Sequence, residues 1–315
     1  MSRTPIQEAI RLALKQNGVI SRAQALDCGL SVSAIQRLLK GEVWIRLHEG
    51  VYALNGSDDS VDRKLFAAHL WLGPESVVSH RAAAARHGFD GFDFAPLEFS
   101  TTSSRRRGSS DVIVHRVKSL ARRDVVTIRG IPATGPTRTL LDLGAVSPEN
   151  RLELALEHAL REGKTCIPKL RDQLTGAGRG VRGAAKLRRL VDWRGDDYVP
   201  AGSPAQVVCM QVMRRFRLPR GLNEYEIFDG TEFIARPDFY FPEKDMVIEV
   251  ESWEWHQGRQ KLDRDSDRRT ALTSRGYRVL TVTMTRLRND PEGFVADFWR
   301  MWNTTLVSEV RSARF

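Results

Sequence analysis

Apolar positions near the start of the chain repeat at the spacing of amphipathic helices. Between residues 6 and 14 they recur every three or four positions, which predicts a helix that is stopped by the following glycine. A second, short helix is predicted at 22–27, where a serine can cap the first turn. A third helix follows, capped by Ser31 or Ser33 and closed by Gly41.

Two β-type runs come next, at 43–48 and 51–54, and a Glu-Gly pair separates them. Helix, helix-turn-helix and hairpin is the element order of a winged helix, whose third helix enters the major groove of DNA while the hairpin touches the backbone. Small helix-turn-helix units also dock proteins, so this alternative stays open. The candidate DNA contacts are Ser31, Ser33, Gln36, Arg37 and Lys40 on the third helix and Arg46 on the wing.

The stretch at 18–54 reads GVISRAQALDCGLSVSAIQRLLKGEVWIRLHEGVYAL. Its glycines, its apolar positions and its Arg-Leu-x-x-Gly-Val-Tyr run resemble the N-terminal domain of AbiEi-type antitoxins and related bacterial regulators. The resemblance covers about fifty residues. It implies a DNA-binding domain and a partner toxin or defence-system protein.

The middle of the chain, from about 61 to 197, mixes helical and strand patterns. The predicted helices lie at 65–72, 79–87, 150–162, 167–174 and 183–191, and the predicted strands at 97–100 and 111–117. This segment is similar to the middle portion of bacterial proteins that join the same two end modules, which implies a layout and no chemistry.

Two features of this middle segment are candidates for phosphate binding or catalysis. Arginines at 105–107 lie in a Ser/Thr-rich loop that can either grip phosphate or stay solvated. Ser79 and His80 are a nucleophile type next to a base type. We expect no catalysis from this pair, because adjacent side chains on a helix diverge.

The last segment, from about 202, carries the strongest chemical pattern. Its predicted elements are a helix at 204–216 capped by Ser203, strands at 224–227, 233–241 and 246–251, a helix at 260–274 and a strand at 277–283. Asp238 lies near the end of one strand, and Glu249 and Glu251 share one face of the next. A tight turn joins the two strands, so the three carboxylates can converge.

Converging carboxylates are costly to bury without a cation, and a hard divalent ion with oxygen ligands resolves the cost. Mg²⁺ (or Mn²⁺) is the expected ion where phosphate is the substrate, because it polarises the scissile phosphate and lowers the pKa of a bound water. The alternative is an amphipathic strand on which Glu249 and Glu251 face solvent.

The acids stand within the stretch ARPDFYFPEKDMVIEVESWEWHQGRQKLDRDSDRRTALTSRGYRVLTVT. It resembles the PD-(D/E)xK nuclease superfamily and, more narrowly, very-short-patch-repair-endonuclease-like domains. The resemblance covers about 110 residues. It implies that Asp238 is the central metal ligand and that Glu249 and Glu251 are further ligands. It also implies that His256 is a general acid/base or a phosphate contact.

The helix after these acids carries Asp265, Arg268 and Arg269. By the same resemblance the arginines can hold phosphate, with an exposed charged helix face as the alternative. The sequence departs from the family at two positions. Gln206 replaces an acid that the family often has on the first helix of this domain, and Glu251 stands where family members usually carry Asp.

Composition favours a protein with a polyanionic partner and argues against disulfide-rich, zinc-stabilised and membrane-spanning classes of protein. The 315 residues carry a net charge of +10, which favours a polyanionic partner. The three cysteines form no CxxC pair, so neither a disulfide framework nor a structural zinc site is expected. No run approaches the ~20 apolar residues of a membrane span, and the first residues lack a signal-peptide pattern, so we expect a cytoplasmic protein.

The predicted fold class is α+β multi-domain. It consists of a winged helix at 1–58, a mixed α/β middle domain at 59–198, and a restriction-endonuclease-like α/β core with a central mixed sheet at 199–315. The first functional hypothesis is a Mg²⁺-dependent endonuclease that hydrolyses DNA phosphodiesters with metal-activated water. The alternative is a DNA-binding, antitoxin-like transcriptional regulator with a catalytically silent nuclease fold. A third hypothesis is a protein-interaction adaptor in a toxin–antitoxin or phage-defence pair.

Overall fold

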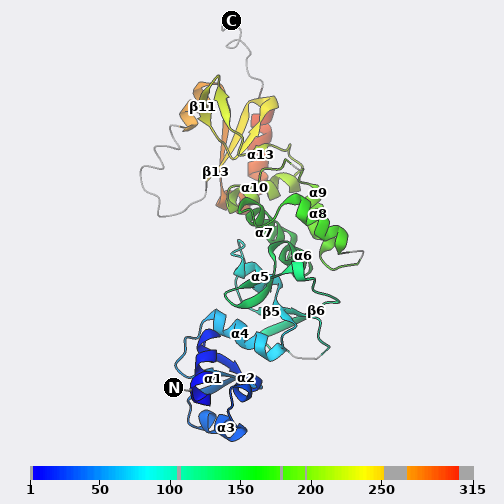
Figure 1. Ribbon diagram of the computed structural model, residues 1–315. Helices are drawn as coiled ribbons and strands as arrows, with labels where there is room; N and C mark the ends of the chain where they lie inside the picture. The colour runs from blue at the N-terminus through cyan, green and yellow to red at the C-terminus, as the bar shows by residue number, and fades with distance from the viewer. Residues whose placement is uncertain (1–2, 105–107, 178–179, 196, 252–267, 305–315) are drawn as a thin grey trace. The chain divides into compact units, whose positions relative to one another are not determined.

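The computed structural model describes residues 3–104, 108–177, 180–195, 197–251 and 268–304 (Figure 1). The chain divides into two compact units, Met1–Arg194 and Gly195–Phe315. No helix among the described residues is long and apolar enough to cross a membrane.

The first unit begins with the predicted winged-helix-like order of elements. These are α1 (Pro5–Lys15), β1 (Val19–Ser21), α2 (Arg22–Asp27), α3 (Val32–Lys40), β2 (Trp44–His48) and β3 (Val51–Leu54). The three strands form an antiparallel sheet in the order β1-β3-β2. Strand β1 is absent from the sequence-based prediction. It has three residues, and its strand character comes from pairing with β3, which lies thirty residues further along the chain.

Local signals explain the helices of this region. Ser21 and Gln24 form a reciprocal capping box at the start of α2, and the side chain of Ser31 caps α3 by accepting from the backbone of Ala34. The apolar faces of the helices then close over Trp44 and Tyr52 of the sheet, whose rings stack. This small core holds α3 against the strands.

The middle of the first unit contains a five-stranded mixed sheet in the order β6-β5-β4-β8-β7. Its strands are β4 (Ser76–Val78), β5 (Leu97–Thr101), β6 (Val112–Arg116), β7 (Val125–Ile128) and β8 (Ile131–Thr134), with a 3-10 turn η1 at Arg122–Asp124. Helices α4 (Val61–Leu72) and α5 (His80–Arg86) pack on this sheet. The sequence predicted β5 and β6 but neither β4 nor the β7–β8 hairpin, because these short segments lack the alternation of a longer strand.

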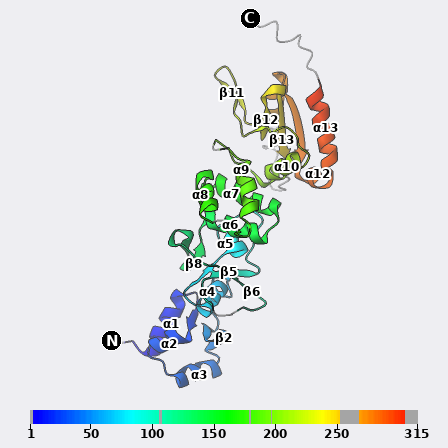
Figure 2. The ribbon, with the colours of Figure 1, turned by 90° about the vertical axis from the view of Figure 1, so that its right-hand side faces the viewer.

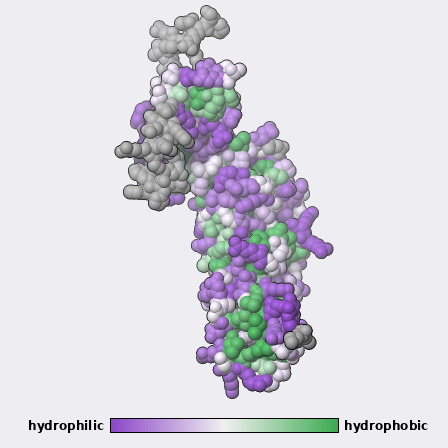
Figure 3. Space-filling model, turned by 60° about the vertical axis from the view of Figure 1, so that its left-hand side comes forward, coloured by the Kyte–Doolittle hydropathy of each residue, from purple (hydrophilic) through white to green (hydrophobic). Residues whose placement is uncertain are grey.

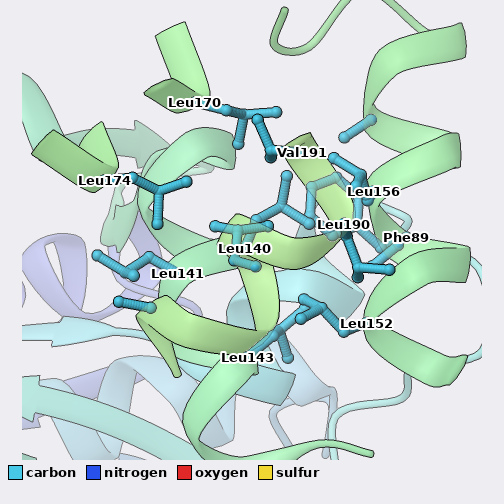
Figure 4. Packing of buried hydrophobic residues seen from close by; sticks show 14 of the residues in the cluster. Phe89, Leu140, Leu141, Leu143, Leu152, Leu156, Leu170, Leu174, Leu190 and Val191 are labelled. Atoms are coloured by element: carbon cyan, nitrogen blue, oxygen red, sulfur yellow. The ribbon is translucent and has the colours of Figure 1, made fainter. Parts of the chain in front are cut away.

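A helical layer completes the first unit (Figures 1 and 2). It consists of α6 (Pro136–Val146), α7 (Glu149–Arg161), α8 (Ile167–Gly176) and α9 (Ala184–Asp192). Leucines from all four helices meet in one core, together with Phe89 (Figure 4). Helix α6 passes so close to the start of α9 that Gly144 and Gly183 touch through their backbones. On the face seen in Figure 3, hydrophilic residues predominate and smaller hydrophobic areas lie between them.

The second unit has a four-stranded mixed sheet in the order β14-β13-β12-β9 and a separate hairpin, β10-β11. Its elements are α10 (Pro204–Arg215), β9 (Leu222–Asn223), β10 (Ile227–Asp229), β11 (Glu232–Ala235), β12 (Phe239–Phe241), η2 (Pro242–Lys244), β13 (Met246–Glu251), β14 (Arg278–Thr283), α12 (Met284–Asn289) and α13 (Pro291–Asn303). The predicted mixed sheet is confirmed, since β13 is parallel to β14 and antiparallel to β12.

The single strand predicted at 233–241 is wrong. It is two strands, β11 and β12, that belong to different sheets. Pro237 lies between them and has no N–H to continue a ladder, so the chain leaves the hairpin there and joins the main sheet. Asp238 is the last residue before β12 and therefore lies at the edge where the chain changes sheets.

Candidate nucleic-acid interface and C-terminal carboxylate cluster

The third helix of the winged-helix region presents a polar, basic surface. Ile35 is 1% exposed and anchors α3 to the core, while the residues that the sequence selected as DNA contacts are exposed. These are Ser31, Ser33, Gln36, Arg37 and Lys40. Helix α3 contains no acidic residue, and both of its basic residues lie in its last turn. The surface therefore combines side chains of the types that can hydrogen-bond base edges with basic side chains of the type that can pair with phosphate.

The wing is the short hairpin of β2 and β3, and it contacts helix α4. Arg46 is exposed on β2, where the register with β3 shifts between Arg46 and His48. The His48 ring stacks on Trp71 of α4, with ring centroids 4.6 Å apart. The imidazole is half-buried, and this loss of solvent lowers the pKa of His48. The stacking places the end of β2 against α4, while Arg46 on the same strand stays exposed.

Asp238 in the second unit lies opposite Glu249 on the neighbouring strand, because Phe239 pairs with Ile248. One carboxylate oxygen, Oδ2, accepts a hydrogen bond of 2.6 Å from the backbone of Val250, and the other, Oδ1, accepts from the Gln206 amide. Burial raises the pKa of Asp238 above its usual value, although these two hydrogen bonds act in the opposite direction.

The two glutamates of β13 have cationic partners. Glu249 is 9% exposed and its Oε2 accepts from Arg268 at 2.8 Å. Glu251 is exposed, and Arg269 donates to it at 3.2 Å. Helix residues that the sequence assigned to phosphate therefore bind the protein's own carboxylates. Their proposed role with phosphate stays a prediction.

A divalent ion such as Mg²⁺ requires several ligands around one point. Among the described residues, no three His, Cys, Asp or Glu side chains lie close enough to hold one metal ion. Amide and guanidinium donors stand beside Asp238, Glu249 and Glu251, so these carboxylates as arranged do not fit a Mg²⁺ ion. His256 and Asp265 lie outside the described residues. Metal binding and catalysis by this set stay predictions.

A further carboxylate next to Asp238, that of Glu224, is absent from the sequence-based prediction of the site. It follows β9, and its Oε1 accepts a 2.7 Å hydrogen bond from the Gln206 amide that also binds Asp238. Arg236 pairs with its other oxygen at 3.3 Å. The carboxylate cluster is thus made by Glu224, Asp238 and the amide of Gln206. The Ser-x-x-Gln capping signal at 203–206 was visible in the sequence, but nothing in it pointed to Glu224.

The Ser79–His80 pair corrects another expectation, since the two side chains do not diverge. Ser79 is the extended N-cap of α5, and His80 opens the helix with a φ of +51°. The Ser79 Oγ therefore lies 2.9 Å from His80 Nδ1. Ser100 donates to the same Oγ, which is completely buried.

The imidazole of His80 stacks on that of His115, with centroids 3.6 Å apart. His115 in turn binds the fully buried carboxylate of Glu98, which also accepts from Arg81. Burial and the neighbouring His115 lower the pKa of His80 to about 3, and the hydrogen bonds from His115 and Arg81 outweigh burial and lower the pKa of Glu98 to about 2. The arrangement is a buried polar network that joins β5, β6 and the start of α5.

Comparison with known proteins bears on the winged-helix region. Residues 7–55 match the family model described as "Transcriptional regulator, AbiEi antitoxin". The N-terminal region is therefore an AbiEi-antitoxin-type transcriptional regulator domain, a class that implies DNA binding. This match ends before the middle sheet and the carboxylate cluster.

Longer similarities reach proteins of Mycobacterium tuberculosis. The chain is 27% identical over 248 residues to "Uncharacterized protein Rv2248" of strain H37Rv, covering 78% of this chain and 88% of that protein. The same values hold for "Uncharacterized protein MT2308" of strain CDC 1551. The crystal structure of the RV2827C protein from M. tuberculosis matches with a TM-score of 0.43 and 15% identity, over 73% of this chain and 90% of that one.

Proposed function

We propose that the protein is a DNA-binding transcriptional regulator of the antitoxin-like kind, and that its second unit keeps a nuclease-like fold without metal-dependent chemistry. The observation that carries the proposal is the exposed, acid-free surface of α3, held on the core by Ile35, within a region that matches AbiEi-type regulators. The net charge of +10 supports approach to a polyanion.

In this proposal α3 enters the major groove. Gln36 and Arg37 are long enough to read base edges, because glutamine pairs with adenine and arginine with guanine. The hydroxyls of Ser31 and Ser33 lie at the helix N-terminus, where phosphate oxygens are favoured. Lys40 and, on the wing, Arg46 then contact phosphates on either side of the groove, which sets the position of the helix.

The test is DNA binding by the full chain to a sequence obtained by in vitro selection. Arg37→Ala is expected to cost about 1–3 kcal/mol on the selected sequence and to relax the preference at one base pair. Lys40→Ala is expected to weaken binding to every sequence and to reduce the salt slope by about one. The matched control is Lys15→Ala, which removes the same charge from an exposed position of α1. If Arg37→Ala and Lys40→Ala both bind DNA as tightly as the control and the unchanged protein, the assignment of α3 is wrong.

A metal-dependent endonuclease is the second candidate. It is supported by the position of Asp238 opposite Glu249 across neighbouring strands of a mixed sheet. It predicts plasmid nicking or linearisation in Mg²⁺ or Mn²⁺, absent in EDTA and absent in Asp238→Ala. A preparation that shifts DNA in a gel but leaves plasmids intact under all these conditions favours the regulator.

An antitoxin-like regulator also implies a protein partner. We propose a toxin or defence-system protein as that partner. Co-expression of the chain with the product of a neighbouring gene, followed by size-exclusion chromatography, tests this part. A complex of both proteins supports it, and separate elution at micromolar concentration counts against it.

A further inference from the structure

The side-chain amide of Gln206 makes four hydrogen bonds, two through its oxygen and two through its nitrogen. Its Oε1 accepts from the backbone N–H groups of Gly202 and Ser203, the second at 3.2 Å. Its Nε2 donates to Glu224 Oε1 at 2.7 Å and to Asp238 Oδ1. The residue is 4% exposed. One buried amide therefore links the start of α10 to two carboxylates from other parts of the sheet.

The direction of this amide is determined by its neighbours. A reversed amide would place its oxygen against two carboxylate oxygens and its NH2 group against two N–H donors. The outer oxygens of the carboxylates are held as well, Asp238 Oδ2 by the Val250 N–H and Glu224 Oε2 by Arg236. The inner oxygens, Oδ1 and Oε1, consequently converge on a single nitrogen atom.

We propose that the Gln206 amide takes the place of a divalent cation between Glu224 and Asp238, so that the second unit is complete without a metal ion. This inference rests on the proposed function, in which the nuclease-like fold is chemically silent. Two inner carboxylate oxygens within hydrogen-bond distance of one point are two of the ligands that a hard cation requires. The amide donates one N–H group to each of these oxygens. Because the amide is neutral, it needs no further anionic ligand, whereas a divalent cation does.

The proposal makes Gln206→Glu the decisive change. The substitution replaces the N–H donors with an oxygen of the same size and brings three carboxylates to one point. Without a cation this arrangement is repulsive and costly to bury, and with Mn²⁺ or Mg²⁺ the three oxygens become ligands. The change therefore creates a cation site where the unchanged chain has none.

The experiment measures Mn²⁺ binding by electron paramagnetic resonance, and thermal unfolding in EDTA, Mg²⁺ and Mn²⁺, all on the full chain. For Gln206→Glu we expect one more bound Mn²⁺ per chain than for the unchanged protein. We also expect an unfolding temperature that falls in EDTA and rises by several degrees in Mn²⁺, because a ligand that binds only the folded state stabilises it. The unchanged protein and the control Gln211→Glu, the same chemical change on the same helix, are expected to show no such dependence.

A second variant covers the case in which Gln206→Glu does not fold. Combining Gln206→Glu with Glu224→Gln exchanges the positions of amide and acid and keeps two carboxylates, so this double variant is expected to unfold at the same temperature in EDTA and in Mn²⁺. The proposal is overturned if the unchanged protein binds Mn²⁺ and loses it in Asp238→Asn. It is equally overturned if a folded Gln206→Glu binds no additional Mn²⁺, or if the double variant binds it as the single variant does.

DNA binding by α3, measured in EDTA, is a separate readout. A protein that fails to bind DNA but gains Mn²⁺ binding through Gln206→Glu contradicts the proposed function and leaves the role of Gln206 standing. A protein that binds DNA and also binds Mn²⁺ through Asp238 leaves DNA binding by α3 standing and overturns the role of Gln206, together with the metal-free second unit. The two results are thus distinguishable in one set of preparations.

Discussion

His80 is expected to make the stability of the first unit depend on pH between neutrality and mild acid. The residue is 5% exposed, and its ring packs between the Ser79 hydroxyl and the ring of His115. Burial and His115 lower the pKa of His80 from 6.5 in an exposed histidine to about 3, against the opposite effect of Glu98. Arg138 and Arg81 make smaller contributions in the same direction as burial and His115.

The sign follows from which state binds the proton. Above pH 6.5 the imidazole is neutral in both the folded and the unfolded chain, so its contribution to stability is fully present. As the pH falls below 6.5 the unfolded chain takes up a proton that the folded chain refuses until about 3, and the free energy of unfolding decreases. From about pH 7 to about pH 5.5, proton uptake by a histidine of ordinary pKa amounts to about 1.3 kcal/mol.

The assay is hydrogen exchange, read by mass spectrometry on peptides that cover β4 and α5, at both pH values. The variant is His80→Asn, because asparagine tolerates the φ of +51° found there and does not titrate. His48, His69 and His87 also have lowered pKa values, but they contribute equally to both proteins and cancel in the difference. The unchanged protein should lose about 1.3 kcal/mol more protection than the variant on acidification. Equal losses would refute the reasoning.

Three substitutions test the packing of the first unit. Arg194→Met leaves the fully buried Glu153 and Glu157 without the guanidinium that both bind, and should lower the free energy of unfolding by about 3–5 kcal/mol in denaturant titrations. Replacing all three residues with apolar ones of similar volume should cost far less, and an equal cost would count against the buried-charge explanation. Trp44→Ala, at a site 1% exposed, should lower the free energy of unfolding by about 3–5 kcal/mol and abolish DNA binding at 37 °C. If the variant keeps both its stability and its DNA binding, the small core around Trp44 is not needed to present α3. Gly183→Ala should destabilise by about 1–3 kcal/mol in calorimetry, because its φ is +87° and a Cβ would overlap the backbone of α6, so an unchanged melting temperature would contradict the close approach.

Much of the fold is local and could be predicted. Helix α2 has the predicted bounds because the Ser21–Gln24 capping box and the following glycine act within a few residues. Strand β13 also has its predicted bounds, since its apolar run is flanked by a turn residue in the left-handed region, Asp245. The winged-helix-like order and the mixed sheet of the second unit follow from such signals, and both are confirmed.

The parts that were missed depend on partners far away in the chain. Strand β1 becomes a strand through β3, and β4 through β5 and β8. These pairings stabilise segments of three residues that have too little pattern of their own. The strand predicted at 233–241 was wrong because alternation continues across Pro237, whereas hydrogen bonding cannot.

The two candidate sites differ in the same way, since one depends on local signals and the other on residues far apart in the chain. The surface of α3 could be selected from sequence, because helical periodicity alone divides Ile35 from Gln36, Arg37 and Lys40. In the second unit the residue types also came from the sequence, but their partners did not. Whether Asp238 meets a cation or an amide depends on where Gln206 and Glu224 fall once helix and sheet are packed together. A hydrogen bond between residues thirty-two positions apart is a property of that packing, and only the tertiary structure decided it.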